Sequence, residues 1–249
     1  MFYLLGRGLR GLFYGIDFVL FTALLYALSY APAALTRRFY PRLFHAWCRS
    51  FVRALGVELR LHQHNIRPLP PQYLLIANHP SAFEDIGIPA LFPVYSLAKA
   101  ELRDWWFVGR IAMATGTLFV QREERESRRA AFDAIVDTLA RGHNVVIYPE
   151  GGCKGRRIFE TFRYGVFDIS LRTGIPIVPV FLHYEAQEDF EWRPGEHLLL
   201  KLWHFLTTRN PRANYHVYDA LDPAQFTSPE AYMQHVHGLY LQWQVRHLD

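Results

Sequence analysis

The sequence is poor in cysteine and shows no metal-binding spacing. Two of its 249 residues are cysteines, Cys48 and Cys153, which argues against a disulfide framework and indicates a reducing compartment. No four-ligand cluster of cysteine and histidine is visible, so the sequence predicts no structural zinc and no metal in the functional site. Internal repeats and low-complexity tracts are also absent from the sequence.

The chain has only a small excess of one charge. Its 27 lysines and arginines outnumber its 23 aspartates and glutamates, which gives a net charge of +4. An excess of this size suits an anionic membrane surface or a phosphorylated substrate. Zinc-finger spacing, an RNA-binding aromatic signature and a basic-region heptad are missing, so we expect no nucleic acid partner.

Hydrophobic residues, in contrast, are abundant. They make up 51% of the chain, and aromatic residues make up 16%. Such a chain can bury a sizeable core, and aromatic rings also favour membrane interfaces. The length suits one α/β domain with an added segment, or two small domains.

The longest uncharged run lies near the N-terminus, at residues 18–35. It is about as long as a helix that crosses a bilayer. Arginines stand on both sides of it, so the run gives no clear orientation. Pro32 would suit a segment that enters one leaflet, breaks and returns. A buried core helix is the alternative.

A second segment, residues 43–55, has the spacing of an amphipathic helix. Arg49 and Arg53 accompany its apolar positions, which is the pattern of a basic helix at a membrane interface. An ordinary surface helix packed on the core would show the same spacing. We assign residues 1–60 to an N-terminal membrane-associated helical segment and residues 61–249 to a second domain.

Predicted strands and helices alternate in this second domain. The sequence therefore predicts an α/β fold, with a mixed central sheet flanked by helices. The predicted strands are residues 73–77, 94–98, 117–120, 144–148, 175–184, 197–205 and 215–220, and the predicted helices are residues 82–91, 127–139, 164–172 and 232–245.

The densest group of reactive side chains is the segment Asn-His-Pro-Ser-Ala-Phe-Glu-Asp at residues 78–85. Ser81 with Glu84 three residues later forms a capping box, which predicts a helix that begins at Ser81. Glu84 then folds back toward His79, whereas Asp85 is turned about 100° away around the helix. A histidine–carboxylate pair can deprotonate a hydroxyl near neutral pH. In the alternative, Glu84 only caps the helix and His79 only ends a strand.

Three later segments place polar groups or prolines in or after strands. Arg122 could grip a phosphate with two hydrogen bonds, or could pair with a surface acid. At Gly151 a substrate could approach the backbone, and Glu150 could bind a polyol or could be an exposed acid in a turn. Pro176 and Pro179 predict an edge strand or a bulge, which would line a site or simply end the sheet.

In this order the segments resemble the glycerolipid acyltransferase family typified by 1-acylglycerol-3-phosphate acyltransferase. The resemblance spans residues 73–184. It rests on Asn78-His79 with Glu84, Gly116 to Arg122, Pro149-Glu150-Gly151 and Val178-Pro179, and on two shorter likenesses at Lys99 and at Phe162, Arg163 and Gly165.

The resemblance implies an O-acyltransferase of phospholipid biosynthesis that needs no cofactor. Its substrates would be acyl-CoA or acyl carrier protein and the hydroxyl of a membrane lipid. His79 would be the general base and Glu84 would orient it, with Asp85 as the rival acid. The hydroxyl would attack the thioester directly, without an acyl-enzyme, and Ser81 would serve the substrate site as a cap and not as a nucleophile.

The resemblance also suggests how the substrates are held. Lys99 or backbone amides would stabilise the oxyanion. Arg122 would bind the phosphate of the acceptor, and Glu150 with Gly151 its glycerol. The enzyme would act at a membrane, on its cytoplasmic face, which in a bacterium is the inner membrane.

One departure from the family pattern leaves the acceptor open. Gly152-Cys153 stands where the family has Thr-Arg or Thr-Lys, which weakens the case for lysophosphatidate unless one of the basic residues 154, 156 and 157 compensates. Lyso-ornithine lipid, glycerol 3-phosphate or a glycolipid are alternative acceptors. A non-catalytic lipid-binding membrane protein and a hydrolase are alternative functions.

Overall fold

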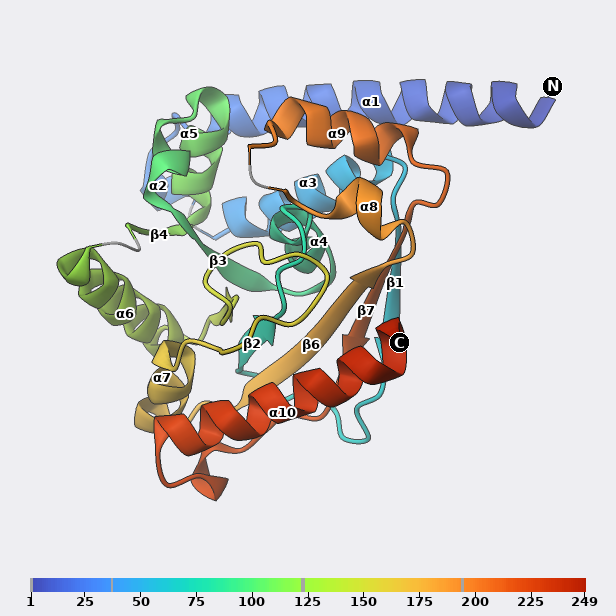
Figure 1. Cartoon of the computed structure of the whole chain (residues 1–249). Coiled ribbons are helices and arrows are strands. Elements are labelled where there is room, and N and C mark those ends of the chain that lie inside the picture. The colour runs from blue at the N-terminus through green and yellow to red at the C-terminus, as the bar shows by residue number, and fades with distance from the viewer. Residues whose placement is uncertain (1, 37, 122–123, 194) are drawn as a thin grey trace.

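A computed structural model describes residues 2–36, 38–121, 124–193 and 195–249. Seven strands form one sheet in the order β1-β7-β6-β2-β5-β3-β4 (Figure 1). The strands are β1 (Glu58–Gln63), β2 (Leu74–Ala77), β3 (Val94–Lys99), β4 (Leu118–Val120), β5 (Asn144–Ile147), β6 (Ile177–Tyr184) and β7 (Arg212–Val217).

Helices lie on both faces of the sheet (Figure 1). Two short 3-10 helices, η1 (Ala100–Asp104) and η2 (Pro223–Gln225), accompany them. The α-helices are α1 (Phe2–Leu28), α2 (Ala33–Thr36), α3 (Tyr40–Ala54), α4 (Glu84–Leu91), α5 (Trp106–Thr115), α6 (Arg125–Ala140), α7 (Gly165–Thr173), α8 (Gln187–Phe190), α9 (Leu198–Thr207) and α10 (Pro229–Leu248).

The sheet is mixed, as predicted. Strand β6 pairs parallel with β2 and antiparallel with β7. The pairs β2–β5, β5–β3 and β3–β4 are all parallel. The carboxyl ends of these four strands therefore meet at one edge of the sheet, where ligands bind in open α/β sheets.

Alternation along the strands gives the sheet two hydrophobic cores. Leu75 and Ala77 of β2 face a core that includes side chains of α1, α3, α4 and α9. Leu74 and Ile76 face the other core, with side chains of α6, α7 and α10. Because side chains in a strand point alternately to opposite faces, the buried run of β2 serves both layers.

Helix α3 belongs to the body of the protein. Its Trp47 and Val52 are buried in the same core as the central strands. The structure thus shows residues 43–55 as a helix packed on the core. Strand β1 runs across the boundary that the sequence suggested between residues 60 and 61.

Helix α1 runs alongside α3 and exposes most of its outer surface. Residues 11–28 form a segment of mean hydropathy 1.8 that is long and apolar enough to cross a membrane, and 6% of it is buried. The helix ends at Leu28, and Pro32 separates it from α2. The apolar run 18–35 is therefore broken between Leu28 and Ala33, in the stretch that contains Pro32, as the sequence predicted.

Two strand predictions were wrong. Residues 197–205 form helix α9 and not a strand. Its Lys201 and Phe205 are buried, whereas Leu199 and Trp203 are 81% and 61% exposed. Because both faces of α9 carry apolar residues, the sequence lacks the polar positions that reveal helical spacing. The last strand was misplaced by a few residues, since β7 ends at Val217.

Strand β6 was expected at an edge of the sheet or at a bulge, and it lies inside the sheet, between β2 and β7, with an irregular ladder at its prolines. The ladder with β7 ends at the pair Val180 and Val217, and the next bridge joins Ile177 to Leu221. Pro179 stands in this interval, where one extra residue of the partner segment interrupts the ladder. Proline has no backbone N–H, and because the ladder between β6 and β7 is interrupted at Pro179, the sheet loses no regular hydrogen bond there.

Candidate active site

His79 follows β2 at the carboxyl edge of the sheet and is 4% exposed. The preceding side chain fixes its position. The Asn78 amide donates to the Leu182 carbonyl at 2.9 Å and accepts from the Leu182 N–H at 2.7 Å. This double hydrogen bond joins the end of β2 to β6 and sets where the chain turns toward His79.

The imidazole of His79 contacts the predicted carboxylate. Its Nδ1 lies 3.1 Å from Oε2 of Glu84, a fully buried residue. The same Oε2 accepts from the Ser81 N–H at 3.1 Å, and Oε1 accepts from the hydroxyl of Tyr184. Asp85, one residue further on, is exposed. The structure thus brings Glu84 to the ring, through the reach-back hydrogen bond of the capping box.

The helix itself begins later than predicted. Helix α4 starts at Glu84 and not at Ser81. The buried Ser81 hydroxyl accepts from the N–H of Phe83 at 3.2 Å. Ser81 therefore satisfies a backbone donor ahead of the helix, and its own N–H holds the carboxylate of Glu84 in place.

The Glu84 carboxyl lies in a strongly desolvated site. Burial raises the pKa of Glu84 to about 8, while hydrogen bonds from Tyr184 and from backbone N–H groups act in the opposite direction. Burial also raises the pKa of Tyr184 well above its usual range. The hydroxyl of Tyr184 therefore stays a donor to the carboxylate, which favours the ionised form that can accept from His79.

The other side of the His79 ring meets two residues from the segment after β5. The ring stacks on Tyr148 with centroids 4.1 Å apart and planes 11° from parallel. Its Nε2 lies 3.5 Å from Sγ of Cys153, a partly exposed residue. With Nδ1 directed at Glu84, Nε2 is the nitrogen that lies next to Cys153.

Glu150 supports the backbone beneath His79. Its two carboxylate oxygens accept from the N–H groups of His79 at 2.7 Å and Phe159 at 3.0 Å. Glu150 is 2% exposed, and burial raises its pKa. In the structure the Glu150 carboxylate thus binds backbone N–H groups of two loops. The sequence had suggested that it would be an exposed acid or would bind a polyol substrate.

Gly151 has a backbone that favours glycine. Its φ is +76°, and an added Cβ would stand 2.3 Å from Nε of Arg163. The guanidinium of Arg163 therefore approaches the loop as closely as a glycine permits. Arg163 comes from the segment that resembles the family's sequence after the Pro-Glu-Gly block, and its side chain lies against Gly151, the residue that follows Glu150.

The remaining predicted ligands are further along the same edge. Lys99 ends β3 and is exposed. It pairs in register with Val120 of β4. Arg122 follows β4 but lies outside the described residues, so its predicted contact with phosphate stays a prediction. Two strand spacings separate β3 from β2, which places Lys99 roughly 10 Å from the His79 side of the edge.

An apolar cavity that is open to solvent lies between α6, α7 and the ends of β3, β4 and β5. Arg128 and Arg163 stand among its lining residues, as do Tyr148 and Gly151 of the His79 site. Its apolar lining includes Leu97, Val120, Phe132, Ile135, Ile147, Val166 and Ile169. A hydrophobic chain with a polar head at one end would match this distribution of side chains.

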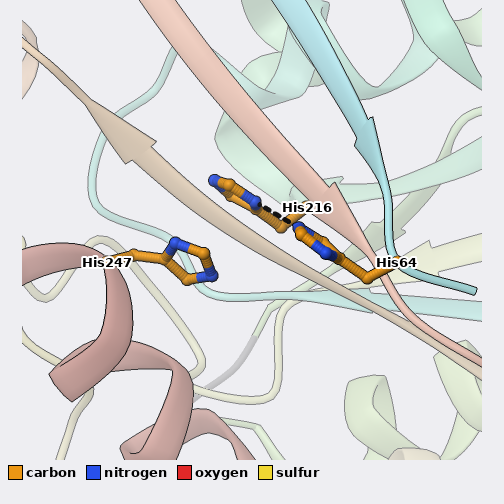
Figure 2. A group of neighbouring side chains, drawn as sticks. All are labelled: His64, His216 and His247. Carbon is orange, nitrogen blue, oxygen red and sulfur yellow. Dashed lines mark hydrogen bonds between the residues drawn. The ribbon is translucent and has the colours of Figure 1, made fainter.

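The fold also assembles histidines that are distant in sequence. One ring nitrogen from each of His64, His216 and His247 lies within 4.8 Å of the others (Figure 2). The His64 and His216 nitrogens are 2.9 Å apart, and the His216 and His247 rings are stacked with centroids 3.9 Å apart. The sequence-based prediction of no metal is not tested by this arrangement.

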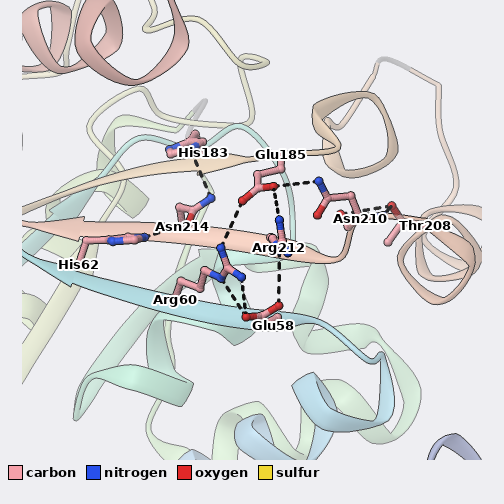
Figure 3. Close-up of polar contacts among 9 residues, drawn as sticks. All are labelled: Glu58, Arg60, His62, His183, Glu185, Thr208, Asn210, Arg212 and Asn214. Carbon is pink, nitrogen blue, oxygen red and sulfur yellow. Dashed lines mark hydrogen bonds and ion pairs between the residues drawn. The ribbon is translucent and has the colours of Figure 1, made fainter. Parts of the chain in front are cut away.

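Two further histidines extend this row, which we call the histidine stripe: His62, His64, His183, His216 and His247. The Asn214 side chain bridges His62 at 2.9 Å and His183 at 3.3 Å (Figure 3). Glu58, Arg60, Glu185 and Arg212 form ion pairs beside the stripe, toward the exposed end of the strands (Figure 3).

The sequence did not reveal three residues that contact the His79–Glu84 pair. Tyr184 ends β6, Tyr148 follows β5, and Cys153 was noted only as a departure from a motif. Tyr148 and Tyr184 each stand at the carboxyl end of a strand, which is the position that could have marked them.

Comparison with known proteins matches the region that carries this site. The family model described as Acyltransferase matches residues 59–183, half of the chain. The chain is 33% identical over 143 residues to the lyso-ornithine lipid O-acyltransferase of Pseudomonas aeruginosa, covering 57% of this chain and 54% of that protein. It is 29% identical over 139 residues to the 1-acyl-sn-glycerol-3-phosphate acyltransferase of Neisseria meningitidis, covering 55% and 53%. The chain thus spans about half the length of the curated relatives it matches.

A solved structure shares the fold over nearly the whole chain. The crystal structure of the 1-acyl-sn-glycerophosphate acyltransferase from Thermotoga maritima matches with a TM-score of 0.69, covering 96% of this chain and 97% of that chain. The two sequences are 18% identical. The likeness therefore extends the shared architecture beyond the matched family region.

Proposed function

The chain belongs to the Acyltransferase family, and from that premise we propose that it transfers a fatty acyl group from a thioester to the hydroxyl of a membrane lipid. The observation that carries the proposal is the His79–Glu84 pair, joined at 3.1 Å, which stands just after β2 at the carboxyl edge of the sheet. No cofactor is needed for such a transfer, because a base and a thioester supply the chemistry.

His79 acts as the general base in this proposal. Its Nε2 takes the proton of the acceptor hydroxyl, and the imidazolium that forms is stabilised by the carboxylate of Glu84 at Nδ1. Glu84 and Glu150 are positioning residues. Glu84 fixes the tautomer, and Glu150 fixes the backbone of His79. The imidazolium then returns its proton to the departing thiolate.

The acyl donor fits the cavity beside the site. Its apolar walls suit the hydrocarbon chain, and the cations Arg128 and Arg163 suit the phosphates of CoA or of the carrier protein's prosthetic arm. Tyr148 belongs both to the cavity and to the stack on His79. A chain lying in the cavity would therefore bring its thioester to the imidazole.

The acceptor class is a lysolipid. The relatives named above are a lyso-ornithine lipid O-acyltransferase and a 1-acyl-sn-glycerol-3-phosphate acyltransferase, and both names describe an acceptor that already carries an acyl chain. We propose 1-acylglycerol 3-phosphate as the first acceptor to test and lyso-ornithine lipid as the second. Lys99 and Arg122 remain the proposed contacts for an anionic headgroup.

Membrane association is supported by the exposed apolar surface of three helices. The outer face of α1 is apolar and exposed, and α1 and α9 line one surface hollow together, through Tyr14 and Leu206 among others. Trp203 of α9 and Trp106 of α5 are 61% and 84% exposed. Tryptophan favours the headgroup level of a bilayer. We propose that this surface, with α1 at its centre, rests in the membrane on its cytoplasmic side.

The deciding experiment measures thioester turnover by the full chain in lipid nanodiscs. Wild-type protein is given acyl-CoA with lysophosphatidate, lyso-ornithine lipid or water as the only acceptor, and the lipid products are identified by mass spectrometry. We expect an acylated lipid with one of the lysolipids and its loss in His79→Ala. Equal consumption by His79→Ala, or free fatty acid without acylated lipid, would contradict the proposal and would favour a lipid-binding protein or a hydrolase.

A further inference from the structure

Lys201 is a buried cation in an otherwise apolar helix. Helix α9 has the sequence Leu-Leu-Leu-Lys-Leu-Trp-His-Phe-Leu-Thr, and its Lys201 is 0% exposed. Leu199 and Trp203 of the same helix are largely exposed, so the lysine points inward while apolar side chains point outward. A buried ammonium is costly unless it is paired and hydrogen-bonded. The role of the lysine therefore depends on the groups that it binds.

Three oxygen atoms contact the ammonium of Lys201. Its Nζ lies 2.8 Å from Oε2 of Glu196. The ammonium also donates to the backbone carbonyls of Glu191 at 2.5 Å and of Asp189 at 3.5 Å. All three partners belong to the stretch of chain from α8 to the start of α9. One buried charge thus gathers both ends of this connection around itself.

The connection that the lysine holds contacts both loops of the candidate active site. The N–H of Trp192 donates at 3.2 Å to the carbonyl of Pro80, the residue after His79. The Glu191 carboxylate accepts at 3.2 Å from the N–H of Arg156, in the loop that follows β5. A displacement of the connection would therefore act on the backbone next to the imidazole.

Aromatic rings join the same part of the chain to the carboxylate beside His79. Phe190 of α8 stacks on Tyr184 with centroids 4.3 Å apart, and on Phe205 of α9 with centroids 4.9 Å apart. The hydroxyl of Tyr184 donates to Glu84. Packed side chains therefore lead from α9 through α8 to the donor that holds the Glu84 carboxylate.

We propose that Lys201 is a positioning residue for the acyl transfer, which fixes the α8–α9 segment (residues 187–193 and 195–207) against the loops of His79 and Arg156. The inference rests on the proposed function, because it assumes that His79 is the base of the transfer. Lys201 acts through the two carbonyls and the carboxylate that it binds. Because the reacting atoms must be held within about 3–3.5 Å of each other, even a small displacement of the base lowers the rate strongly.

The first variant is Lys201→Met, which keeps a long side chain and removes its charge. We expect kcat to fall between about 10- and 100-fold, the scale for a small misplacement of reacting groups, with KM for acyl-CoA within about twofold of wild type. Turnover is measured with the full chain in lipid nanodiscs, well below the unfolding temperature of each variant. Tyr232→Phe is the stability control, because it removes a buried hydroxyl that donates to the Leu221 carbonyl in the core on the other face of the sheet. It should lower the unfolding temperature and keep kcat.

Amide hydrogen exchange separates local positioning from general loosening of the fold. The N–H groups of Trp192 and Arg156 are the donors of the two loop contacts. In Lys201→Met we expect both to exchange faster, as followed by mass spectrometry of short peptides, while helix α10 exchanges as in wild type. Wild-type kcat in this variant, or exchange in α10 that accelerates to the same extent, would overturn the proposal.

A second variant keeps the proposal testable should Lys201→Met not fold. Glu196→Gln removes the charge that faces Lys201 but keeps an oxygen for the Arg193 N–H, and the Glu196 side chain is 17% exposed. We expect a smaller loss of kcat in the same direction, because the lysine keeps its two carbonyl partners. Glu188→Gln neutralises an exposed acid of α8 and should keep kcat.

The possible failures are distinct. If Glu196→Gln turns over as fast as Glu188→Gln, the buried ion pair does not position the site, and the transferase function stands without it. Absence of thioester turnover in the wild-type protein would instead overturn the proposed function itself.

Discussion

Histidines occupy two very different environments in this molecule. His79 has a carboxylate on one nitrogen and a thiol near the other. His216 has other imidazoles as neighbours: His62 at 4.5 Å, His183 at 5.2 Å and His247 at 3.9 Å between ring centroids. A carboxylate partner stabilises the imidazolium that forms when the ring takes a proton, whereas imidazole partners and burial oppose it. The first environment suits a base, and the second suits a neutral packing layer.

The pKa values follow this difference. Burial, followed by the proximity of His247, lowers the pKa of His216 to about 2, and burial lowers the pKa of His247 to about 4. Within the histidine stripe, His216 and His247 therefore stay uncharged at neutral pH. The rings of the stripe act as flat, partly apolar side chains between the sheet and the C-terminal helix α10.

The largest effect should distinguish the two histidines directly. We expect His79→Gln to lower kcat by about 10³-fold, within the contribution of a general base, because glutamine cannot take the acceptor proton. The same change at His216 should leave kcat within about twofold and lower the unfolding temperature instead. Steady-state turnover and thermal unfolding, measured on both variants, check this. An equal loss of turnover in both variants would contradict the assignment of His79 as the base and of His216 as a packing residue.

A smaller effect should follow when the carboxylate beside His79 is neutralised. We expect Glu84→Gln to lower kcat by roughly 100-fold with little change in KM, since Glu84 stabilises the charged ring without touching substrate. Burial raises the Glu84 pKa to about 8, so wild-type kcat should rise with pH up to that region as the His79–Glu84 pair loses its proton. The variant should lose this dependence.

Asp85→Asn is the matched control for Glu84→Gln, because Asp85 is exposed one residue further along α4. It should keep kcat within about twofold and should keep the wild-type pH profile. If Asp85→Asn removes activity and Glu84→Gln does not, the wrong carboxylate has been assigned to the imidazole.

The smallest effect concerns stability in acid. Below pH 6.5 the unfolded chain protonates its histidines, whereas the folded chain keeps His216 and His247 neutral to about pH 2 and 4. The unfolded state then binds more protons, so stability falls as pH falls below 6.5. We expect a loss of about 1 kcal/mol per pH unit for a buried histidine, seen as a lower unfolding temperature at pH 5. His216→Gln should reduce this slope, and His197→Gln, an exposed control, should not.

Much of the site could be predicted because its central elements are local in sequence. The strand-to-helix junction at His79 and the reach-back of Glu84 involve residues five apart, and the capping box predicted the reach-back although helix α4 begins three residues later than expected. The mixed sheet followed from alternating strands and helices. The position of β6 in the sheet and the end of β7 were harder to predict. Pro179 is tolerated inside the sheet because the pairing with β7 becomes irregular beyond Val217, and the sequence of β6 alone does not show this.

Other parts could not be predicted because they depend on contacts between distant segments. Cys153 reaches His79 across 74 positions, and His64 reaches His216 across 152. The order of strands in the sheet brings these residues together, and a single sequence does not contain that order. Helix α9 was missed for a different reason, since its exposed side is apolar and resembles a buried strand.

Asp17 gives the apolar helix α1 a defined orientation about its axis. Its Oδ2 accepts from the Ser50 hydroxyl of α3 at 2.6 Å. A carboxylate is costly in hydrocarbon, so only the rotation that turns Asp17 toward α3 leaves the opposite side free to face lipid. In the membrane placement proposed above, this hydrogen bond fixes which side of α1 is turned to the lipid.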